Sequence, residues 1–413
     1  MAPRLLTVGY AQPGYGFGRV MGELHRAFAG AFDLEHFDLA RLPSAAADAA
    51  ISMPARADAA EVWRTVAAGA FDAVFLFCDL EFAAACAARR PPAAPRLVAY
   101  VPIDSPVQPS PAWAGLARLD ALAVYTRFAR DSLDAALARL GLPTPPIHIV
   151  PHGIDRAAFF PLHADAMRAR ADARAALFGD RHALHHAFLV LNANRNQPRK
   201  RVDLTLHAFR RFLDLVPDAD AKLYLHMGLR DRGVRLLPLA AELGIEDRLL
   251  LTGFTLRHPA TTDAHLNLIY NACDVGLNTA DAEGWGLVAF EHAAARKPQL
   301  VPAHTGCGEL WRDAGCLIPA ARYRDHALDR DAFEVDIGAA AATLARLYRD
   351  PALRAQRAER AFRHARDGSL GWNEVGDRLA RLLNADIRPA GMPIPSPEAP
   401  MRPSAMHAPV APP

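Results

Sequence analysis

Two glutamates, Glu283 and Glu291, lie eight positions apart in the segment E-G-W-G-L-V-A-F-E. Residues 274–278 before it read as a short buried strand, and apolar residues recur at helical spacing after the glycines. The first amides of a helix lack internal partners and carry the positive end of its dipole, so they bind phosphate well. Eight residues at about 1.5 Å rise span roughly 12 Å, so the carboxylates can bracket a diphosphate. A nucleotide-sugar has this layout of sugar, two phosphates and ribose.

The same segment resembles a known signature. The glutamate pair with its Gly-Trp-Gly core resembles the E-x7-E motif of retaining GT-B glycosyltransferases, especially glycosyltransferase family 4. The resemblance implies that Glu283 holds the transferred sugar and Glu291 the ribose. The residues expected around the donor diphosphate at the helix start are Gly284, Trp285, Gly286 and Leu287. The alternative is a solvated helix start in which glutamate is a favourable first-turn charge.

A basic loop, N-R-N-Q-P-R-K-R at residues 194–201, lies between a predicted strand at 187–192 and a predicted helix at 203–215. Similar enzymes carry an arginine and then a lysine here, and Arg195 and Lys200 match that pattern. Such cations bind phosphate oxygens and stabilise the charge that the leaving diphosphate gains. The alternative is a basic surface turn, and Arg199 and Arg201 are candidates for facing water.

Two segments in the first half of the chain also resemble the family. The segment P-H-G-I-D at 151–155 resembles the one that ends the first domain, and it supports the family and the boundary only. The loop P-G-Y-G-F-G-R at 13–19 stands where similar enzymes carry adjacent glycines, so Gly16 is a donor-binding candidate, with Arg19 as a phosphate contact. A dinucleotide-binding fingerprint is excluded, because the third glycine of G-x-G-x-x-G is missing.

The acceptor side is predicted from one residue. Asp104 follows the predicted strand at 97–101 and is expected to face the cleft, where it could orient the acceptor hydroxyl or the donor sugar. The alternative for Asp104 is an Asx turn before Pro106. The segment 304–309 resembles a small-residue loop of the family, with a plain strand-to-helix turn as the alternative. No metal and no cofactor are expected beyond the nucleotide-sugar co-substrate, since the histidines and cysteines show no zinc spacing.

Composition narrows the class of protein. The 413 residues suffice for two domains, and a net charge of +2 gives no broad surface for nucleic acid. The five cysteines are odd in number and form no C-x-x-C pair, which favours reduced thiols. The sequence shows no secretory signal pattern and no apolar segment of membrane-spanning length. We therefore expect a cytoplasmic protein, with peripheral contact at the inner face of the cell membrane as an open alternative.

Strand-like apolar segments alternate with helical patterns along the chain, which indicates βαβ units and parallel sheets. The expected fold is α/β of the GT-B type, with two Rossmann-like doubly wound domains facing a central cleft. The predicted units are an acceptor domain at 1–165, a connector at 166–186, a nucleotide-sugar-binding domain at 187–370, a helix crossing back to the first domain at 371–386, and a disordered Pro-rich tail at 387–413.

The resemblance implies a metal-independent, retaining transferase that moves a sugar from a nucleoside-diphosphate sugar to a hydroxyl of a glycan or glycolipid. In such enzymes the donor phosphate helps to deprotonate the incoming hydroxyl, so no dedicated nucleophile is expected. Two alternatives stay open. One is a non-catalytic nucleotide-sugar-binding scaffold of the same fold, and the other is a nucleotide-sugar epimerase.

Overall fold

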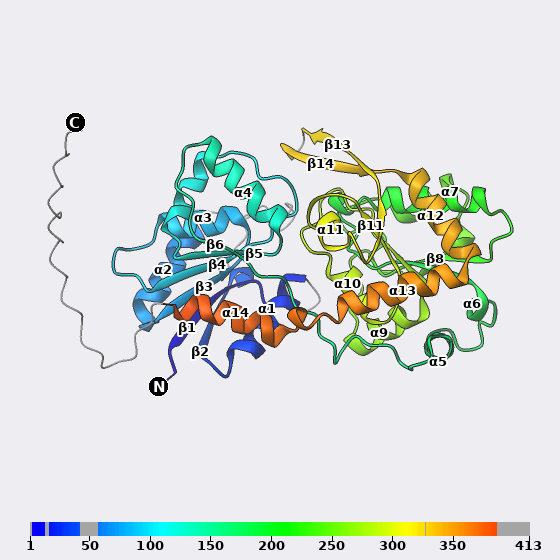
Figure 1. Ribbon diagram of the computed structural model, residues 1–413, viewed down its shortest axis with the longest axis horizontal. Coiled ribbons are helices and arrows are strands. Elements are labelled where there is room, and N and C mark those ends of the chain that lie inside the picture. The colour runs from blue at the N-terminus through cyan, green and yellow to red at the C-terminus, as the bar shows by residue number, and fades with distance from the viewer. Residues whose placement is uncertain (1, 13–15, 42–56, 327, 386–413) are drawn as a thin grey trace, which may run out of the picture.

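The computed structural model describes residues 2–12, 16–41, 57–326 and 328–385, which build two sheets side by side (Figure 1). The strand order is β2-β1-β3-β4-β5-β6 in the first sheet and β12-β11-β10-β7-β8-β9 in the second. Every pairing within these two six-stranded sheets is parallel. The predicted α/β fold with two doubly wound sheets is confirmed.

The first half of the chain contains the first sheet and its helices. Its strands are β1 (Arg4–Gly9), β2 (Asp33–Asp38), β3 (Ala73–Phe77), β4 (Arg96–Tyr100), β5 (Ala121–Val124) and β6 (Ile147–Ile149). Its helices are α1 (Gly16–Phe28), α2 (Ala57–Gly69), α3 (Leu80–Ala88) and α4 (Arg127–Arg139).

The second half contains the second sheet and a separate hairpin. Its parallel strands are β7 (Phe188–Asn192), β8 (Ala221–Leu225), β9 (Leu249–Leu251), β10 (Val275–Leu277), β11 (Gln299–Pro302) and β12 (Cys316–Ile318). The antiparallel hairpin consists of β13 (Ala320–Asp325) and β14 (Arg330–Val335). The helices are α5 (Ala166–Phe178), α6 (Ala183–His186), α7 (Val202–Leu215), α8 (Leu236–Glu242), α9 (Asp263–Ala272), α10 (Leu287–Ala294), α11 (Thr305–Leu310), α12 (Ile337–Arg349), α13 (Pro351–Ala365) and α14 (Trp372–Asn384).

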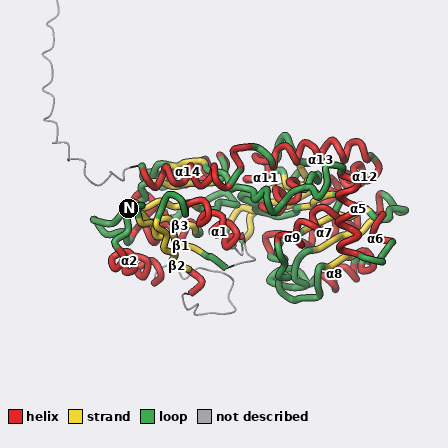
Figure 2. Tube along the Cα trace, turned by 90° about the horizontal axis from the view of Figure 1, so that it is seen from below, coloured by secondary structure: helices red, strands yellow, loops and turns green. Residues whose placement is uncertain are grey.

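The central strands β3 and β7 are apolar except for Asn192 at the end of β7. β3 reads A-V-F-L-F and β7 reads F-L-V-L-N, and every residue of both strands is buried. Parallel strands lose the polar alternation because helices cover both faces of the sheet. Figure 2 shows this layering, with α13 and α14 along one side of the molecule and α2 and α8 toward the other.

The last helix leaves the second half and lies against the first. In α14 the buried residues Trp372, Val375, Leu379 and Leu383 form one face. This face packs beside α1, and a Cβ added to Gly376 would lie 2.4 Å from the Cβ of Ala27. The preceding α13 packs on α10 instead, so the chain crosses between the halves at residues 366–371. The predicted domain boundaries at 165, 186, 370 and 386 stay a prediction.

Some elements differ from expectation. The connector at 166–186 holds the helices α5 and α6, although the sequence pattern indicated no element there. The buried face of α5 consists of Ala169, Ala173, Arg174 and Phe178, so Phe178 is its one large apolar residue and the helical pattern is weak. The hairpin β13–β14 was also not predicted. The tail at 387–413, and Gly14 in the first glycine loop, lie outside the described residues.

Within the described ranges, no helix combines the length and the apolar character that crossing a membrane requires.

Candidate active site

Glu283 lies in the loop between β10 and α10, and the residue is only 6% exposed. Lys200 Nζ donates a hydrogen bond to Glu283 Oε2, and Asn278 Nδ2 donates to the same oxygen at 3.3 Å. Burial opposes ionisation of this carboxyl, but the charges of Lys200 and Arg199 outweigh burial and hold its pKa below the usual value. Glu283 is therefore an ionised carboxylate whose orientation is fixed by its partners.

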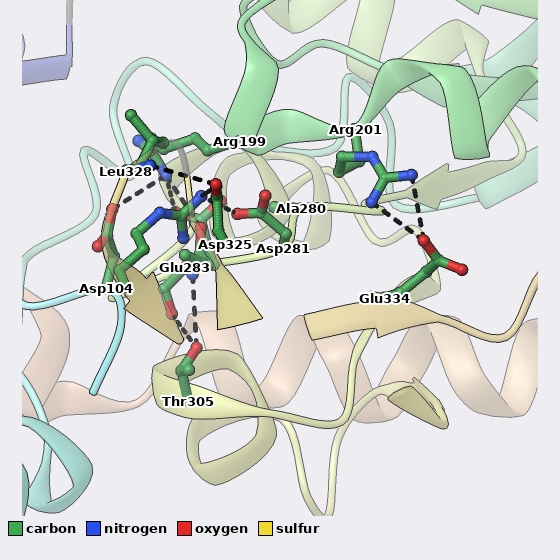
Figure 3. A network of polar contacts seen from close by, with 12 residues as sticks. Asp104, Arg199, Arg201, Ala280, Asp281, Glu283, Thr305, Asp325, Leu328 and Glu334 are labelled. Carbon is green, nitrogen blue, oxygen red and sulfur yellow. Dashed lines mark hydrogen bonds and ion pairs between the residues drawn. The ribbon is translucent and has the colours of Figure 1, made fainter. Parts of the chain in front are cut away.

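The start of α11 supports the backbone of Glu283. Thr305 Oγ1 donates to the Glu283 carbonyl oxygen at 2.9 Å, a contact drawn in Figure 3. Beside it, a Cβ added to Gly306 would lie 2.1 Å from the carbonyl oxygen of Gly284. Only glycine therefore allows α11 to approach this loop so closely. The segment 304–309 serves here as a support for the loop.

The glycine-rich turn leads directly into α10. Gly286 precedes the helix with a φ of 86°, a conformation that L side chains rarely adopt. Trp285 is buried and stacks on Phe290, with ring centroids 4.6 Å apart, so its side chain packs in the core. Leu287 begins the helix, and its Cδ1 lies 3.8 Å from the position of a Cβ added to Gly16. The predicted glycine loop of the first half thus reaches the helix start of the second.

Glu291 lies in the second turn of α10 and is also 6% exposed. Tyr270 of α9 donates to Glu291 Oε2 at 2.7 Å, and Arg19 Nε lies 3.6 Å from Oε1. Arg19 belongs to α1, and its guanidinium also pairs with Asp263 at 2.6 Å. Burial raises the pKa of Glu291 although Arg19 opposes the shift. Arg19 therefore ties the first half of the molecule to the second glutamate.

The basic loop places its residues differently from the prediction. Lys200 reaches Glu283, as described above, but the ion pair of Arg195 is with Asp231, at 2.9 Å. Arg199 instead enters the site, because its Nη1 donates to the Ala282 carbonyl at 3.0 Å and lies 3.8 Å from Glu283 Oε1. Arg199 thus contacts the site, although its side chain is still 36% exposed to water. A 3₁₀ turn at Pro198–Lys200 directs Arg199 and Lys200 to the same side.

Asp104 comes from the loop after β4 and meets the basic loop across the two halves. Its Oδ2 lies 3.4 Å from Arg199 Nη1, as Figure 3 shows. The backbone before Asp104 also lies close to the glycine-rich turn, since a Cβ added to Gly284 would lie 2.7 Å from the Ile103 carbonyl oxygen. The structure therefore brings the predicted acceptor-side residue to the predicted sugar-binding glutamate through Arg199.

His152 lies at the centre of the contact between the halves. It is 4% exposed, and its ring packs against Tyr125, Trp285 and Trp372 at centroid distances of 3.9, 5.7 and 5.8 Å. Burial lowers its pKa to about 3, and its Nδ1 lies 2.7 Å from the hydroxyl of Tyr100. His152 is therefore a neutral packing residue, in agreement with a structural role for segment 151–155.

Several residues of the site were not predicted from the sequence. They are Asn278 beside Glu283 and Tyr270 beside Glu291, whereas Thr305 belongs to the predicted segment 304–309 and only its contact with Glu283 was not predicted. Asn278 could have been found, because it ends the predicted strand immediately before the glycine-rich turn. In the described part of the chain, no three His, Cys, Asp or Glu side chains are grouped so that they could hold a metal ion.

The chain matches the model of a known protein family. The model described as "Family 4 Glycosyltransferase in conflict systems" matches residues 166–379, which is more than half of the chain. The chain belongs to glycosyltransferase family 4. The predicted family is thereby confirmed, and the matched region contains both glutamates and the basic loop.

Curated relatives of this family 4 member are similar over part of their length. A D-inositol 3-phosphate glycosyltransferase of Thermomonospora curvata is 31% identical over 256 residues, which cover 59% of this chain and 51% of that protein. A mannosylfructose-phosphate synthase of Agrobacterium fabrum is 28% identical over 209 residues, covering 49% of this chain and 40% of that protein. This chain thus spans about half the length of the curated relatives it matches.

Solved structures show the fold of the family 4 member over nearly its whole length. A sucrose-phosphate synthase from Thermosynechococcus elongatus superposes with a TM-score of 0.69 at 17% identity, covering 92% of this chain and 98% of that one. A UDP-forming trehalose-phosphate synthase from Burkholderia vietnamiensis gives a TM-score of 0.66 at 15% identity, covering 93% and 99%. At such identity the likeness shows the fold alone, and it confirms the predicted GT-B architecture.

Proposed function

We propose that this family 4 member is a retaining glycosyltransferase that moves a sugar from a nucleoside-diphosphate sugar to an acceptor hydroxyl. The observation that carries the proposal is the pair of buried glutamates on either side of the α10 start, each beside its own cation. Glu283 contacts Lys200, and Glu291 contacts Arg19. The helix start between them offers free amides and a glycine-rich approach for a diphosphate.

The geometry supports a role for each group. Glu283, ionised and fixed by Lys200 and Asn278, would accept hydrogen bonds from hydroxyls of the donor sugar. Lys200 and Arg199 would stabilise the negative charge that develops on the leaving diphosphate. Glu291 would accept the ribose hydroxyls. Arg195 pairs with Asp231 at 2.9 Å, and its predicted role at the diphosphate stays a prediction.

In the proposed reaction the bond between the anomeric carbon and the donor phosphate breaks as the acceptor oxygen attacks the same face of the sugar. The acceptor proton passes to the departing phosphate oxygen, so no enzyme nucleophile is consumed. Charge builds up on the diphosphate, and fixed cations in a buried site stabilise such charge more than water does. Lys200 and Arg199 lie beside Glu283 and so stand near that charge.

Acceptors of two chemical classes are compatible with the proposed reaction. The family resemblance favours a glycan or glycolipid hydroxyl, and a glycolipid would bring the enzyme into contact with a membrane surface. The relatives are named for products or substrates that are sugar or polyol phosphates, such as D-inositol 3-phosphate and mannosylfructose-phosphate. Both classes present a hydroxyl to the same site, so an acceptor panel needs to contain both.

Donor binding and turnover test the proposal together. A thermal-shift panel of UDP, GDP, ADP and dTDP is expected to show stabilisation by one of them. A nucleotide at about 100 times its Kd adds roughly 2.7 kcal/mol, and Lys200→Ala should remove most of that shift. With the matching nucleotide-sugar, Glu283→Gln should lower the rate of sugar transfer by at least about 100-fold. It should lower the rate of donor hydrolysis by the same factor.

The matched control is Glu334→Gln on the hairpin, whose carboxylate is 58% exposed. It should leave turnover unchanged. Wild-type transfer rates in Glu283→Gln would contradict the proposal. Nucleotide binding without turnover across the whole acceptor panel would favour the non-catalytic scaffold.

A further inference from the structure

The hairpin β13–β14 packs against the loop that carries Glu283. In Figure 1 it extends from the second half, next to α12, toward the first half. Its sequence is highly charged, A-A-R-Y-R-D in one strand and R-D-A-F-E-V in the other. Arg322 and Arg324 pair with Asp331 within the hairpin, whereas Arg330 pairs with Asp281 outside it.

Arg330 of the hairpin holds Asp281, which lies two positions before Glu283. Its Nη2 is 2.8 Å from Asp281 Oδ1, and the two side chains are 15% and 4% exposed. Tyr323 contributes a longer hydrogen bond, from its hydroxyl to Asp281 Oδ2 at 3.4 Å. Two side chains of the hairpin thus hold Asp281, and Figure 3 shows this residue beside Glu283.

The backbone of Asp281 is fixed as well. Its carbonyl oxygen accepts a hydrogen bond from the Phe333 amide at 3.0 Å, and its own amide donates to the Arg199 carbonyl at 2.8 Å. Asp281 therefore joins three segments, namely the hairpin, the basic loop and the loop that leads to Glu283. A shift of the hairpin would therefore displace the backbone that leads to Glu283.

A second contact runs through His304. Its ring stacks on Phe333 of the hairpin, with centroids 4.5 Å apart and planes at 12°. The same ring lies 3.0 Å from the Ala280 carbonyl through Nε2 and 3.1 Å from Thr305 Oγ1 through Nδ1. Since Thr305 in turn binds the Glu283 backbone, the hairpin supports the glutamate from two directions.

We propose that the hairpin positions Glu283 and that Arg330 is a positioning residue which acts through Asp281. The inference rests on the proposed function, in which Glu283 holds the transferred sugar. Removing Arg330 would leave the nearly buried carboxylate of Asp281 without its closest cation, and an unpaired buried charge forces its surroundings to rearrange. Asp281 would move toward water and take the adjoining loop with it.

Arg330→Met tests this with Arg322→Met as the matched control. Arg322 lies on the same hairpin and pairs with Asp331, but its side chain is 62% exposed. Arg330→Met should lower kcat for transfer and donor hydrolysis by about 10- to 100-fold, the loss typical of a small misplacement. Nucleoside-diphosphate affinity should change less than about threefold, because Lys200 and Glu291 are untouched. Arg322→Met should match wild type in both.

Hydrogen exchange provides a readout that does not depend on activity. Amides at 278–286 should exchange faster in Arg330→Met than in Arg322→Met, since they lose a fixed neighbour. Adding Asp281→Asn should restore part of both the protection and the turnover, because the unpaired charge is gone. Arg330→Lys should fall between Arg330→Met and wild type.

Equal exchange and equal kcat in the two Arg→Met variants would overturn the positioning role while the proposed function stood. A rise in donor KM at constant kcat would also overturn it, since Arg330 would then contact the substrate itself. If wild type binds no nucleotide and turns over no donor, the proposed function fails. The exchange comparison at 278–286 then decides the positioning role alone.

Discussion

Two residues of one type have opposite electrostatic settings in the site. Glu283 lies beside Lys200 and Arg199, and these charges keep its pKa below the usual value despite burial. Glu291 has a single, more distant cation, Arg19, so burial dominates and its pKa is raised. Under the proposed function, the carboxyl with the lowered pKa holds the sugar hydroxyls and the carboxyl with the raised pKa holds the ribose.

We predict different effects from the two glutamine variants. Glu291→Gln keeps an oxygen for the Tyr270 hydroxyl, which lies 2.7 Å from Oε2, but loses the charge that faces Arg19. Calorimetric titration with the matching nucleoside diphosphate should show about tenfold weaker binding, or about 1.4 kcal/mol, with a smaller fall in kcat. Glu283→Gln should show the reverse. An unchanged Kd in Glu291→Gln would contradict the ribose assignment.

Residue types and spacing predicted the two glutamates and Lys200, but not which arginine joins them. Arg195 and Arg199 are chemically equivalent in the sequence. Their directions depend on the 3₁₀ turn at Pro198–Lys200 and on Arg201, whose φ is 42°. The Arg330–Asp281 pair was also beyond prediction, because the two residues are 49 positions apart and neither belongs to a motif.

At the scale of elements, the site depends on close backbone approach between the halves. The loop at Gly284 touches the backbone after β4, where an added Cβ would lie 2.7 Å from the Ile103 carbonyl oxygen and 3.2 Å from its carbon. Backbone cannot rotate away as a flexible side chain can. The two halves would have to separate slightly to accept even one methyl group there.

We therefore predict that Gly284→Ala lowers the free energy of unfolding by about 1–3 kcal/mol, as overpacking does. Urea unfolding should measure it. The matched control is Gly22→Ala in α1, where an added Cβ meets nothing within 4 Å. That change should be neutral or stabilising by about 0.5–1 kcal/mol, since alanine favours helix more than glycine. A Gly284→Ala variant as stable as wild type would contradict the prediction, because the backbone would then have moved at little cost.

Sequence patterns located the strands better than the elements beside them. The segments at 97–101 and 187–192 were placed to within one residue, because strands buried on both faces are mostly apolar. The hairpin β13–β14 lacks that signal, since half of its strand residues are charged, and its contacts with the loop before Glu283 come from Arg330, Tyr323 and Phe333. The hairpin is held by contacts with a loop that is distant in the sequence. Its own residues therefore do not predict it.

At the scale of the whole molecule, buried histidines set the response to acid. Burial lowers the pKa values of several of them, to about 3 for His152, His226 and His292 and to about 4 for His258 and His304. In the unfolded chain these groups titrate near 6.5. Below that pH the unfolded chain binds protons that the folded chain does not, so stability falls.

We predict that the free energy of unfolding falls as the pH is lowered below about 6.5. Each histidine contributes up to about 1.4 kcal/mol per pH unit. Asp79 opposes one of them, because burial raises its pKa to about 6 and the folded chain takes up that proton first. Urea unfolding between pH 5 and 8 measures the slope, and His292→Leu should reduce it by one proton. Equal stability at pH 5 and 7.5 would contradict the prediction.

The groups of the proposed site are unevenly shared along the chain. Glu283, Glu291 and Lys200 fall inside residues 166–379, the region that the family model matches, whereas Asp104 and Gly16 precede it. Each half keeps its own sheet, and the chain passes between them only around residues 150–187 and again at 366–371 in the described structure. Under the proposed function, substitutions in the first half can change which acceptor receives the sugar. The second half then keeps its donor site. Divergence of the acceptor half then carries little penalty for the donor half.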